Sequence, residues 1–303
     1  MSRVAAIDCG TNSLRLLIAD ISDGNFREVT RQMEVVRLGQ GVDRTKAFDL
    51  VAIERTLKVT AEYANIIRSK GVEKVRFCAT SASRDATNRH LFIDGVREIL
   101  GIEPEVIPGE EEAALSFTGA TKELSQTDAP FLVVDIGGGS TEFVYGADRV
   151  IAAISVNIGC VRMKERHLLS QPPTADQLMA AIADIDAAIA HAAEIVPITT
   201  SKTLIAVAGT ATTVAAAALG LESYDRYAIH LSRIPAAKIH EVAAKFQSMP
   251  KAEIAALGYM HPGRVDVITA GSLVFSQVVS ASGAKEVVVS ESDILDGMAW
   301  SLV

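Results

Sequence analysis

The chain has 303 residues, of which 49% are hydrophobic and 22% charged, a balance typical of a soluble globular enzyme with about two domains. Its formal net charge of −8 argues against nucleic acid as a partner, because binding to a duplex needs a basic face. The same charge does not exclude a polyanionic substrate, since backbone N–H groups of a glycine turn and a bound cation can outweigh it locally.

The cysteines and the apolar segments bear on the cellular compartment. Cys9, Cys78 and Cys160 match no metal-binding spacing, and we expect them to be buried, reduced thiols. Cys9 lies in a candidate anion-binding turn, but its strand neighbours favour a side chain in the core over a nucleophile. No signal-peptide pattern opens the chain, and no apolar stretch is long enough to span a membrane. These features predict a cytoplasmic protein with no membrane partner.

The first predicted element is a hairpin over residues 4–18. Two apolar, β-branched runs read as buried strands, and Asp8 ends the first of them. The small residues between the strands would leave backbone N–H groups open to an anion. The candidate anion-binding residues of this turn are Gly10, Thr11, Asn12 and Ser13.

The next predicted elements are a strand over 26–38, a helix over 49–69 capped by Asp49, a strand over 72–80 and a helix over 88–100. The segment 80–85 follows the end of a strand, which is the usual binding edge of an α/β sheet. Arg84 in this segment could neutralise a phosphate or form an ion pair with Asp85.

Residues 106–115 predict a strand, a turn and a helix that begins with Glu110, Glu111 and Glu112. Acidic residues in a first helical turn complement the helix dipole. Three in succession exceed that requirement, so one of them could have another role. The polar segment 122–130 follows the helix and marks a boundary. We therefore predict an N-terminal domain over 1–124, completed by a C-terminal helix over 293–303, and a second domain over 125–292.

A second hairpin over 131–145 repeats the design of the first. Asp135 corresponds to Asp8, and Gly137 corresponds to Gly10. A carboxylate at the end of an apolar strand is costly unless it is paired or holds a metal ion. The repetition suggests two similar halves, each presenting a phosphate-binding turn to a shared cleft. The turn of this second hairpin contains Gly137, Gly138, Gly139, Ser140, Thr141 and Glu142.

A third glycine turn occurs between an apolar strand that starts at Leu204 and an alanine-rich helix. Gly209 and Thr210 lie at the start of that helix, where free N–H groups and the helix dipole favour anions. The other elements predicted in this half are a strand over 151–156, helices within 159–169 and over 174–195, helices beginning at Ile234 and Lys251, a helix over 265–282, a strand over 287–290 and a helix over 293–302.

These turns resemble the signature turns of the actin–Hsp70–sugar kinase superfamily and, within it, those of the exopolyphosphatase/guanosine pentaphosphate phosphohydrolase (Ppx/GppA) family. The segments 8–15, 135–142 and 208–213 carry the resemblance, together with 79–86, 108–113, 157–162 and 261–267. Two departures are Ala208, where the family often has Gly, and the lack of the additional C-terminal region of long members. The resemblance implies an α/β fold with two similar ribonuclease H-like (actin-like ATPase) domains flanking an interdomain cleft, in a short two-domain form that is a homodimer.

The resemblance also implies an activity. This activity is the hydrolysis of the terminal phosphate of inorganic polyphosphate. The hydrolysis of pppGpp to ppGpp is a further candidate reaction. Aligned on Gly-x-Glu-Glu-Ala, Glu111 matches the general base of the family. Phosphoryl transfer depends mainly on positioning and charge stabilisation, so no Ser or Cys nucleophile is needed. Mg²⁺, with Mn²⁺ as an alternative, would bind to carboxylates. The implied phosphate-binding residues are Gly10, Thr11, Asn12, Ser13, Arg15, Arg84, Gly137, Gly138, Gly139, Ser140, Gly209 and Thr210, and the implied metal ligands are Asp8, Asp135 and Glu142.

Two alternatives stay open at this point. One is an ATP-dependent small-molecule kinase of the same superfamily, and the other is a nucleotide-responsive scaffold without catalytic activity. The presence of Glu111 disfavours both. We also expect a preference for short polyphosphate, because the chain ends at Val303 without the additional region and its net charge of −8 repels a long polyanion.

Overall fold

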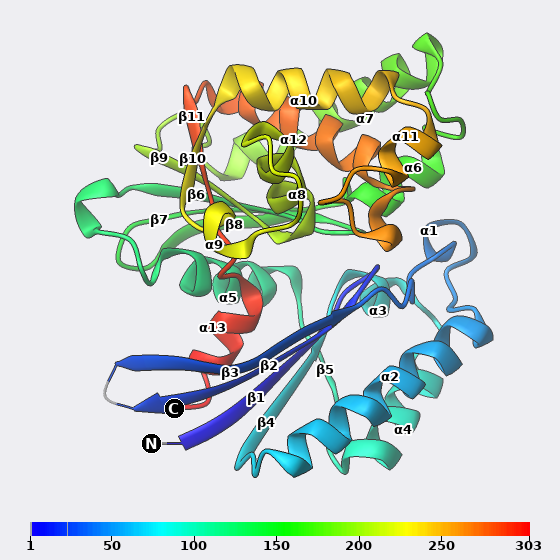
Figure 1. Cartoon of the computed structure of the whole chain (residues 1–303), viewed down its shortest axis with the longest axis vertical. Coiled ribbons are helices and arrows are strands. Elements are labelled where there is room, and N and C mark those ends of the chain that lie inside the picture. The colour runs from blue at the N-terminus through cyan, green and yellow to red at the C-terminus, as the bar shows by residue number, and fades with distance from the viewer. Residues whose placement is uncertain (1, 23) are drawn as a thin grey trace. The chain divides into compact units, whose positions relative to one another are not determined.

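The computed structural model describes residues 2–22 and 24–303, which form two compact units (Figure 1). Unit 1 comprises Met1–Gly119 and Ile294–Val303, and unit 2 comprises Ala120–Asp293. The domain limits at 124/125 and 292/293 stay a prediction. Within the described residues, no helix combines the length and apolar character that crossing a membrane requires.

Unit 1 is built on a five-stranded sheet with the strand order β3-β2-β1-β4-β5. The first three strands are antiparallel neighbours, whereas β4 is parallel to β1 and β5 is parallel to β4. The strands are β1 (Ser2–Cys9), β2 (Leu14–Ser22), β3 (Asn25–Glu34), β4 (Lys74–Ala79) and β5 (Glu105–Val106).

Alternate side chains of β1 enter two different cores, as the period of two in a strand requires. Ala5 and Ile7 pack with Tyr63 and Phe92 on one face of the sheet, whereas Val4 packs on the other face with α5 and α13 (Figure 1). The predicted cap of α2 is confirmed, because the Asp49 side chain accepts hydrogen bonds from two backbone N–H groups. The helices of unit 1 are α1 (Val42–Thr45), α2 (Leu50–Ser69), α3 (Ser81–Asp85), α4 (Arg89–Leu100), α5 (Gly109–Thr121) and α13 (Ile294–Trp300).

Unit 2 contains a six-stranded sheet with the order β10-β11-β9-β6-β7-β8. One prediction was wrong here, because the helix expected to begin at Ile234 is preceded by a strand. Residues Ser232–Pro235 pair with β11 at the edge of the sheet, where the missing N–H group of Pro235 is tolerated. The strands are β6 (Phe131–Ile136), β7 (Thr141–Gly146), β8 (Val150–Val156), β9 (Thr203–Val207), β10 (Ser232–Pro235) and β11 (Glu286–Val289).

The helices of unit 2 pack on the sheet face that carries Leu132, Val134 and Ile136. The predicted cap of α7 by Thr174 is present as a complete capping box with Gln177. The helices are α6 (Cys160–Arg166), α7 (Ala175–Ile195), α8 (Ala208–Ala218), α9 (Arg226–Ile229), α10 (Ala236–Ser248), α11 (Lys251–Ala255) and α12 (Ile268–Ser282), with 3₁₀ turns at Gln126–Asp128 and Pro262–Arg264.

The two sheets share one topology. The order β8-β7-β6-β9-β11 in unit 2 repeats the order β3-β2-β1-β4-β5 in unit 1, with the same parallel and antiparallel neighbours. The predicted α/β fold with two similar ribonuclease H-like (actin-like ATPase) domains is therefore confirmed. The cleft expected between them stays a prediction.

Candidate functional site

The β1–β2 turn of unit 1 is closed by a hydrogen bond from the Gly10 N–H to the Ser13 carbonyl, 3.0 Å long. Asp8 and Arg15 lie opposite one another in the two strands. Arg15 donates to the same Asp8 oxygen from Nη2 at 2.7 Å and from Nε at 2.9 Å. Arg15, which the resemblance implies as a phosphate contact, thus neutralises Asp8, which it implies as a metal ligand. The carbonyl of Asn12 accepts a hydrogen bond from the Arg37 N–H at 2.8 Å, so the following loop lies against the turn.

Two buried hydroxyl groups near this turn have no hydrogen-bond partner among residues 2–22 and 24–303, namely Thr11 Oγ1 and Ser83 Oγ. Gly39 packs against Thr11 and against Ala82, the residue before Ser83. A Cβ at position 39 would lie 2.4 Å from Thr11 Cγ2 and 2.8 Å from Ala82 Cβ. A buried hydroxyl group without a partner is costly, so each of these groups is available to donate to a bound oxyanion. Thr11 was among the sequence candidates, whereas Ser83 was missed although it directly precedes Arg84.

The first turn of α5 presents two adjacent glutamates to different arginines. Glu112 Oε2 lies 2.7 Å from Arg84 Nη1, and the side chain of Glu112 is 11% exposed. Glu111 Oε1 lies 2.5 Å from Arg76 Nη2, and the side chain of Glu111 is 41% exposed. Successive residues of a helix point about 100° apart, so the two carboxylates cannot face the same group.

The positions of the two arginines show which of the two glutamates lies nearer to the edge of the sheet that carries the Gly10 turn. Arg76 lies within β4, and its Nη1 donates to Ser301 Oγ at 2.9 Å. Arg84 follows the carboxyl end of β4 and donates to the carbonyl of Ile107, just beyond β5, at 3.0 Å. The end of β4 is tied to the end of β1 by the Thr80 N–H, which donates to the Cys9 carbonyl at 3.1 Å. The Arg84 partner, Glu112, therefore lies nearer to the carboxyl edge of the sheet.

The β6–β7 turn of unit 2 has the same closing hydrogen bond, from the Gly137 N–H to the Ser140 carbonyl at 3.0 Å. The start of α6 supports this turn from outside. The N–H groups of Cys160 and Val161 donate to the carbonyls of Gly137 and Gly138 at 2.9 and 2.8 Å. Arg162 Nε completes the support by donating to the Gly139 carbonyl at 2.6 Å. All three glycine carbonyls are thereby bound to α6.

Gly159 directly precedes α6 and packs against this turn, and sequence reasoning did not include it among the site residues. A Cβ at Gly159 would lie 2.3 Å from both the carbonyl carbon and the oxygen of Gly138, and 2.5 Å from the nitrogen of Gly139. Only glycine allows the chain before α6 to approach the turn so closely. The available signal was Gly159 itself, which directly precedes a predicted helix.

Asp135 and Glu142 lie opposite one another in β6 and β7, both buried. Glu142 Oε1 accepts hydrogen bonds from Ser140 Oγ and from Ser155 Oγ, each 2.6 Å long. Ser140, an expected phosphate contact, therefore directs its hydroxyl group to Glu142. Two carboxylates directly opposite one another in a sheet destabilise it unless a cation or a shared proton compensates.

The two halves thus differ at one equivalent position, where unit 1 has Arg15 and unit 2 has Glu142. Residues 2–22 and 24–303 contain no group of three or more His, Cys, Asp or Glu side chains that could hold a metal ion. Mg²⁺ is commonly bound through only one or two carboxylates and completes its shell with water and substrate phosphates. The pair Asp135 and Glu142 fits such an ion, whereas Asp8 already has a guanidinium partner.

The third glycine turn is covered by an arginine. Arg264 Nη1 donates to the Gly209 carbonyl at 2.8 Å and to Thr213 Oγ1 at 3.0 Å. A Cβ at Gly209 would lie 2.1 Å from Arg264 Nη2, so a larger residue would displace the guanidinium group from this position. The Thr210 side chain is buried, and Gly271 leaves room for it, since a Cβ there would lie 2.6 Å from Thr210 Oγ1. The side chain that lies over this turn is therefore that of Arg264.

Ala208, one of the two departures from the family pattern, has a backbone φ of 67°. This left-handed conformation costs an L-residue about 1–2 kcal/mol. Glycine avoids this strain, but it loses more backbone entropy on folding than alanine does, which offsets about 0.5–1 kcal/mol of the gain. Ala208→Gly is therefore expected to raise the free energy of unfolding by about 0.5–1 kcal/mol in urea denaturation. As a control, Ala217→Gly inside the same helix should lower it by about 1 kcal/mol. Equal losses in both variants would contradict the strain assigned to Ala208.

The buried cysteines are poor nucleophiles. All three are free thiols, and burial raises the pKa of Cys9 well above its usual value, with the nearby charge of Asp8 adding to the shift. Burial also raises the pKa of Cys160. These thiols stay protonated at neutral pH, which agrees with the expectation that Cys9 is a core residue.

Known proteins resemble this chain over all or part of its length. Exopolyphosphatase 2 of Mycobacterium tuberculosis is 45% identical over 315 aligned residues, which cover 100% of this chain and 99% of that protein. A guanosine-5′-triphosphate,3′-diphosphate pyrophosphatase of Vibrio cholerae is 36% identical over 179 residues, covering 59% of this chain and 36% of that protein.

Solved structures agree with these relatives. The crystal structure of an exopolyphosphatase-like protein superposes with a TM-score of 0.96 at 43% identity, covering 99% of this chain and 97% of that chain. The Ppx/GppA family member of Aquifex aeolicus superposes with a TM-score of 0.82 at 29% identity, covering 99% and 97%. The family model described as the Ppx/GppA phosphatase family matches residues 17–303. With these matches and the duplicated glycine turns, the chain belongs to the Ppx/GppA phosphatase family.

Proposed function

We propose that this protein hydrolyses the terminal phosphoanhydride bond of inorganic polyphosphate, and that pppGpp is a second substrate. The observation that carries the proposal is the duplicated turn, closed in both units by a Gly N–H to Ser carbonyl bond of 3.0 Å and preceded in both by a buried aspartate. The names of the Mycobacterium and Vibrio relatives, an exopolyphosphatase and a guanosine-5′-triphosphate,3′-diphosphate pyrophosphatase, support both substrates. Neither relative is named as a kinase or as a scaffold.

In the proposed mechanism, backbone N–H groups of the turns and the hydroxyl group of Thr11 donate to phosphoryl oxygens. Arg84 adds positive charge at the sheet edge of unit 1. Asp135 and Glu142 would hold Mg²⁺, or Mn²⁺ in its place, which supplies charge neutralisation of the phosphates when bound. A glutamate of α5 accepts the proton of the attacking water.

The contacts favour Glu112 over Glu111 as this proton acceptor. Glu111 is held by Arg76, which lies within β4 and also donates to Glu105 and Ser301. Glu112 lies beside Arg84, which directly follows Ser83, one of the two residues whose hydroxyl groups have no partner among the described residues. Glu111 remains the residue implied by the motif alignment, and the matched variants described in the Discussion distinguish the two.

The metal proposal predicts different effects for the two aspartates. Asp135→Asn should raise the Mg²⁺ concentration that gives half-maximal activity, because a hard cation loses a charged oxygen neighbour. Asp8→Asn should change that concentration less, since the Asp8 charge is already neutralised by Arg15. Titration of activity with Mg²⁺ measures both. A midpoint that does not move in Asp135→Asn would assign this carboxylate a purely structural role.

The proposed activity is tested by measuring phosphate release from short polyphosphate, long polyphosphate and pppGpp at equal concentrations of chain ends. We expect a higher kcat/KM for the short chains, because the net charge of −8 repels the distal part of a long polyanion. Formation of ADP from ATP with a small-molecule acceptor would indicate the kinase alternative instead. No phosphate release from any substrate would favour the scaffold.

We also propose that the protein acts in the cytoplasm as a homodimer. The free, buried thiols support a reducing compartment. Sedimentation of the purified protein measures the oligomeric state directly.

A further inference from the structure

The last helix of the chain, α13, lies directly against the backbone of α5, the helix that carries Glu111 and Glu112 (Figure 1). Gly297 is the buried residue of α13 at this contact. A Cβ at this position would lie 2.0 Å from the carbonyl oxygen of Leu115, 2.7 Å from its carbonyl carbon and 3.0 Å from its Cα. These are backbone atoms, which cannot rotate away as the end of a side chain can. The two helices therefore come this close because residue 297 has no side chain.

The contact lies one helical turn from the two glutamates. Leu115 follows Glu112 by three residues and Glu111 by four, and residues at these spacings are neighbours in adjacent turns of a helix. The hydrogen bonds within the helix connect these turns rigidly. A shift of α5 at Leu115 is therefore passed on to both glutamates.

The position of α13 is fixed by the sheet of unit 1. The buried carboxylate of Asp296 lies 2.6 Å from Arg31 Nη2 of β3, and breaking a buried ion pair is costly. Met298 packs in the core formed with β1 and β2. Beyond the helix, the Leu302 carbonyl accepts a hydrogen bond from Lys74 Nζ of β4 at 2.7 Å. Because α13 is held on both sides of Gly297, a side chain at position 297 would displace α5 rather than α13.

One guanidinium group also joins the end of the chain to the first turn of α5. Arg76 Nη1 donates to Ser301 Oγ at 2.9 Å, and Arg76 Nη2 lies 2.5 Å from Glu111 Oε1. The glutamates are thus oriented by arginines at the start of α5 and by the contact with α13 one turn further along.

We propose that α13 positions the catalytic glutamate of α5, with Gly297 as the positioning residue. This role rests on the proposed hydrolysis, and it applies to Glu111 and Glu112 alike because both belong to the same turn. Moving the Leu115 carbonyl oxygen from 2.0 Å to 3.0 Å from a new Cβ shifts α5 by about 1 Å, and such a shift of a catalytic group can cost about a hundredfold in rate. Substrate binding should change less, because the proposed phosphate contacts come from other segments.

Gly297→Ala tests the proposal through the division of its effect between kcat and KM. We expect kcat for short polyphosphate to fall by about tenfold to a hundredfold, while KM stays within about twofold of the wild-type value. Gly95→Ala is the matched control, since its Cβ would lie 2.5 Å from the Leu57 side chain between α4 and α2. It should lower the melting temperature and leave kcat and KM unchanged. An unchanged kcat in Gly297→Ala, or a loss confined to KM, would overturn the proposal.

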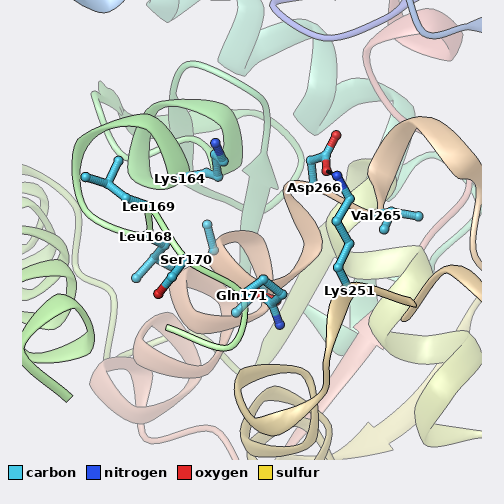
Figure 2. A pocket seen from close by; sticks show the side chains of 10 residues that line it. Lys164, Leu168, Leu169, Ser170, Gln171, Lys251, Val265 and Asp266 are labelled. Atoms are coloured by element: carbon cyan, nitrogen blue, oxygen red, sulfur yellow. Dashed lines mark ion pairs between the residues drawn. The ribbon is translucent and has the colours of Figure 1, made fainter. Parts of the chain in front are cut away.

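Asp296→Asn loosens α13 without adding a side chain, and it decides the matter if Gly297→Ala does not fold. It weakens the ion pair with Arg31, so kcat should fall about fivefold while KM is unchanged. Lys251→Ala is its control, because it breaks an exposed ion pair with Asp266 at the rim of a cavity of about 250 Å³ in unit 2 (Figure 2). This control should keep the wild-type kcat and KM. A wild-type kcat in Asp296→Asn would refute the role of α13.

Hydrogen exchange separates this proposal from the proposed hydrolysis, because it requires no activity. The amide groups of α5 should exchange at least about tenfold faster in Gly297→Ala than in the wild type, whereas those of α4 should not change. Gly95→Ala should give the reverse pattern. Unchanged exchange in α5 would show that α13 does not hold this helix. If the wild type releases no phosphate although exchange changes as expected, the hydrolysis and the catalytic role of α13 fail, but the structural contact stands.

Discussion

Glu112→Gln is expected to lower kcat for polyphosphate hydrolysis by about two to four orders of magnitude, the range for loss of a general base. The amide is nearly isosteric but cannot accept the proton of the attacking water. Binding of substrate should persist, because Arg84 keeps its hydrogen bond to the Ile107 carbonyl and loses only a carboxylate that competes with phosphate for it. Steady-state phosphate release and a separate binding measurement give the two quantities.

Glu111→Gln is the matched control, since it removes one charge from the adjacent residue and also breaks one ion pair with an arginine. We expect this variant to retain kcat within about tenfold, because the pair it breaks lies near the surface and contributes little. The opposite ranking, with Glu111→Gln inactive and Glu112→Gln active, would restore the assignment that the motif alignment implies. Near-normal rates in both variants would exclude either glutamate as the base.

Gly159→Ala should have the second large effect, a loss of activity of about a hundredfold or more, because misplacement of a binding group by about 1 Å is enough for such a loss. The new Cβ would be 2.3 Å from the Gly138 carbonyl, so the turn or the start of α6 must move. The movement also strains the hydrogen bonds between α6 and the turn carbonyls. Phosphate release and the melting temperature should both be measured.

Gly95→Ala provides the comparison for Gly159→Ala. A Cβ at Gly95 would lie 2.5 Å from Leu57 Cδ1, a close contact between α4 and α2 of unit 1. It should lower the melting temperature while the folded protein keeps most of its catalytic rate, since neither a glycine turn nor α5 is touched. If Gly159→Ala also keeps its rate, the support of the turn by α6 is not needed for catalysis.

Local patterns in the sequence determined most of the fold. Apolar runs such as Leu132–Ile136 in the β6 segment predict buried strands, and the caps at Asp49 and Thr174 predict helix starts, because these signals act between residues close in the chain. The duplicated turn after Asp8 and Asp135 was visible for the same reason. Strand β10 was missed because a short edge strand that ends in proline carries a weak periodic signal.

The tertiary structure decided the roles of individual side chains at the turns. The different environments of Glu111 and Glu112 arise from arginines 35 and 28 residues away, and the contact between Arg264 and Gly209 joins residues 55 apart. Likewise, the spacing from the aspartate places Arg15 and Glu142 at equivalent positions, but only the strand register shows that each lies directly opposite the aspartate of its hairpin. A helix rotates successive side chains by about 100°, so neighbours in a motif can face different groups, and only the packing of distant segments selects between them.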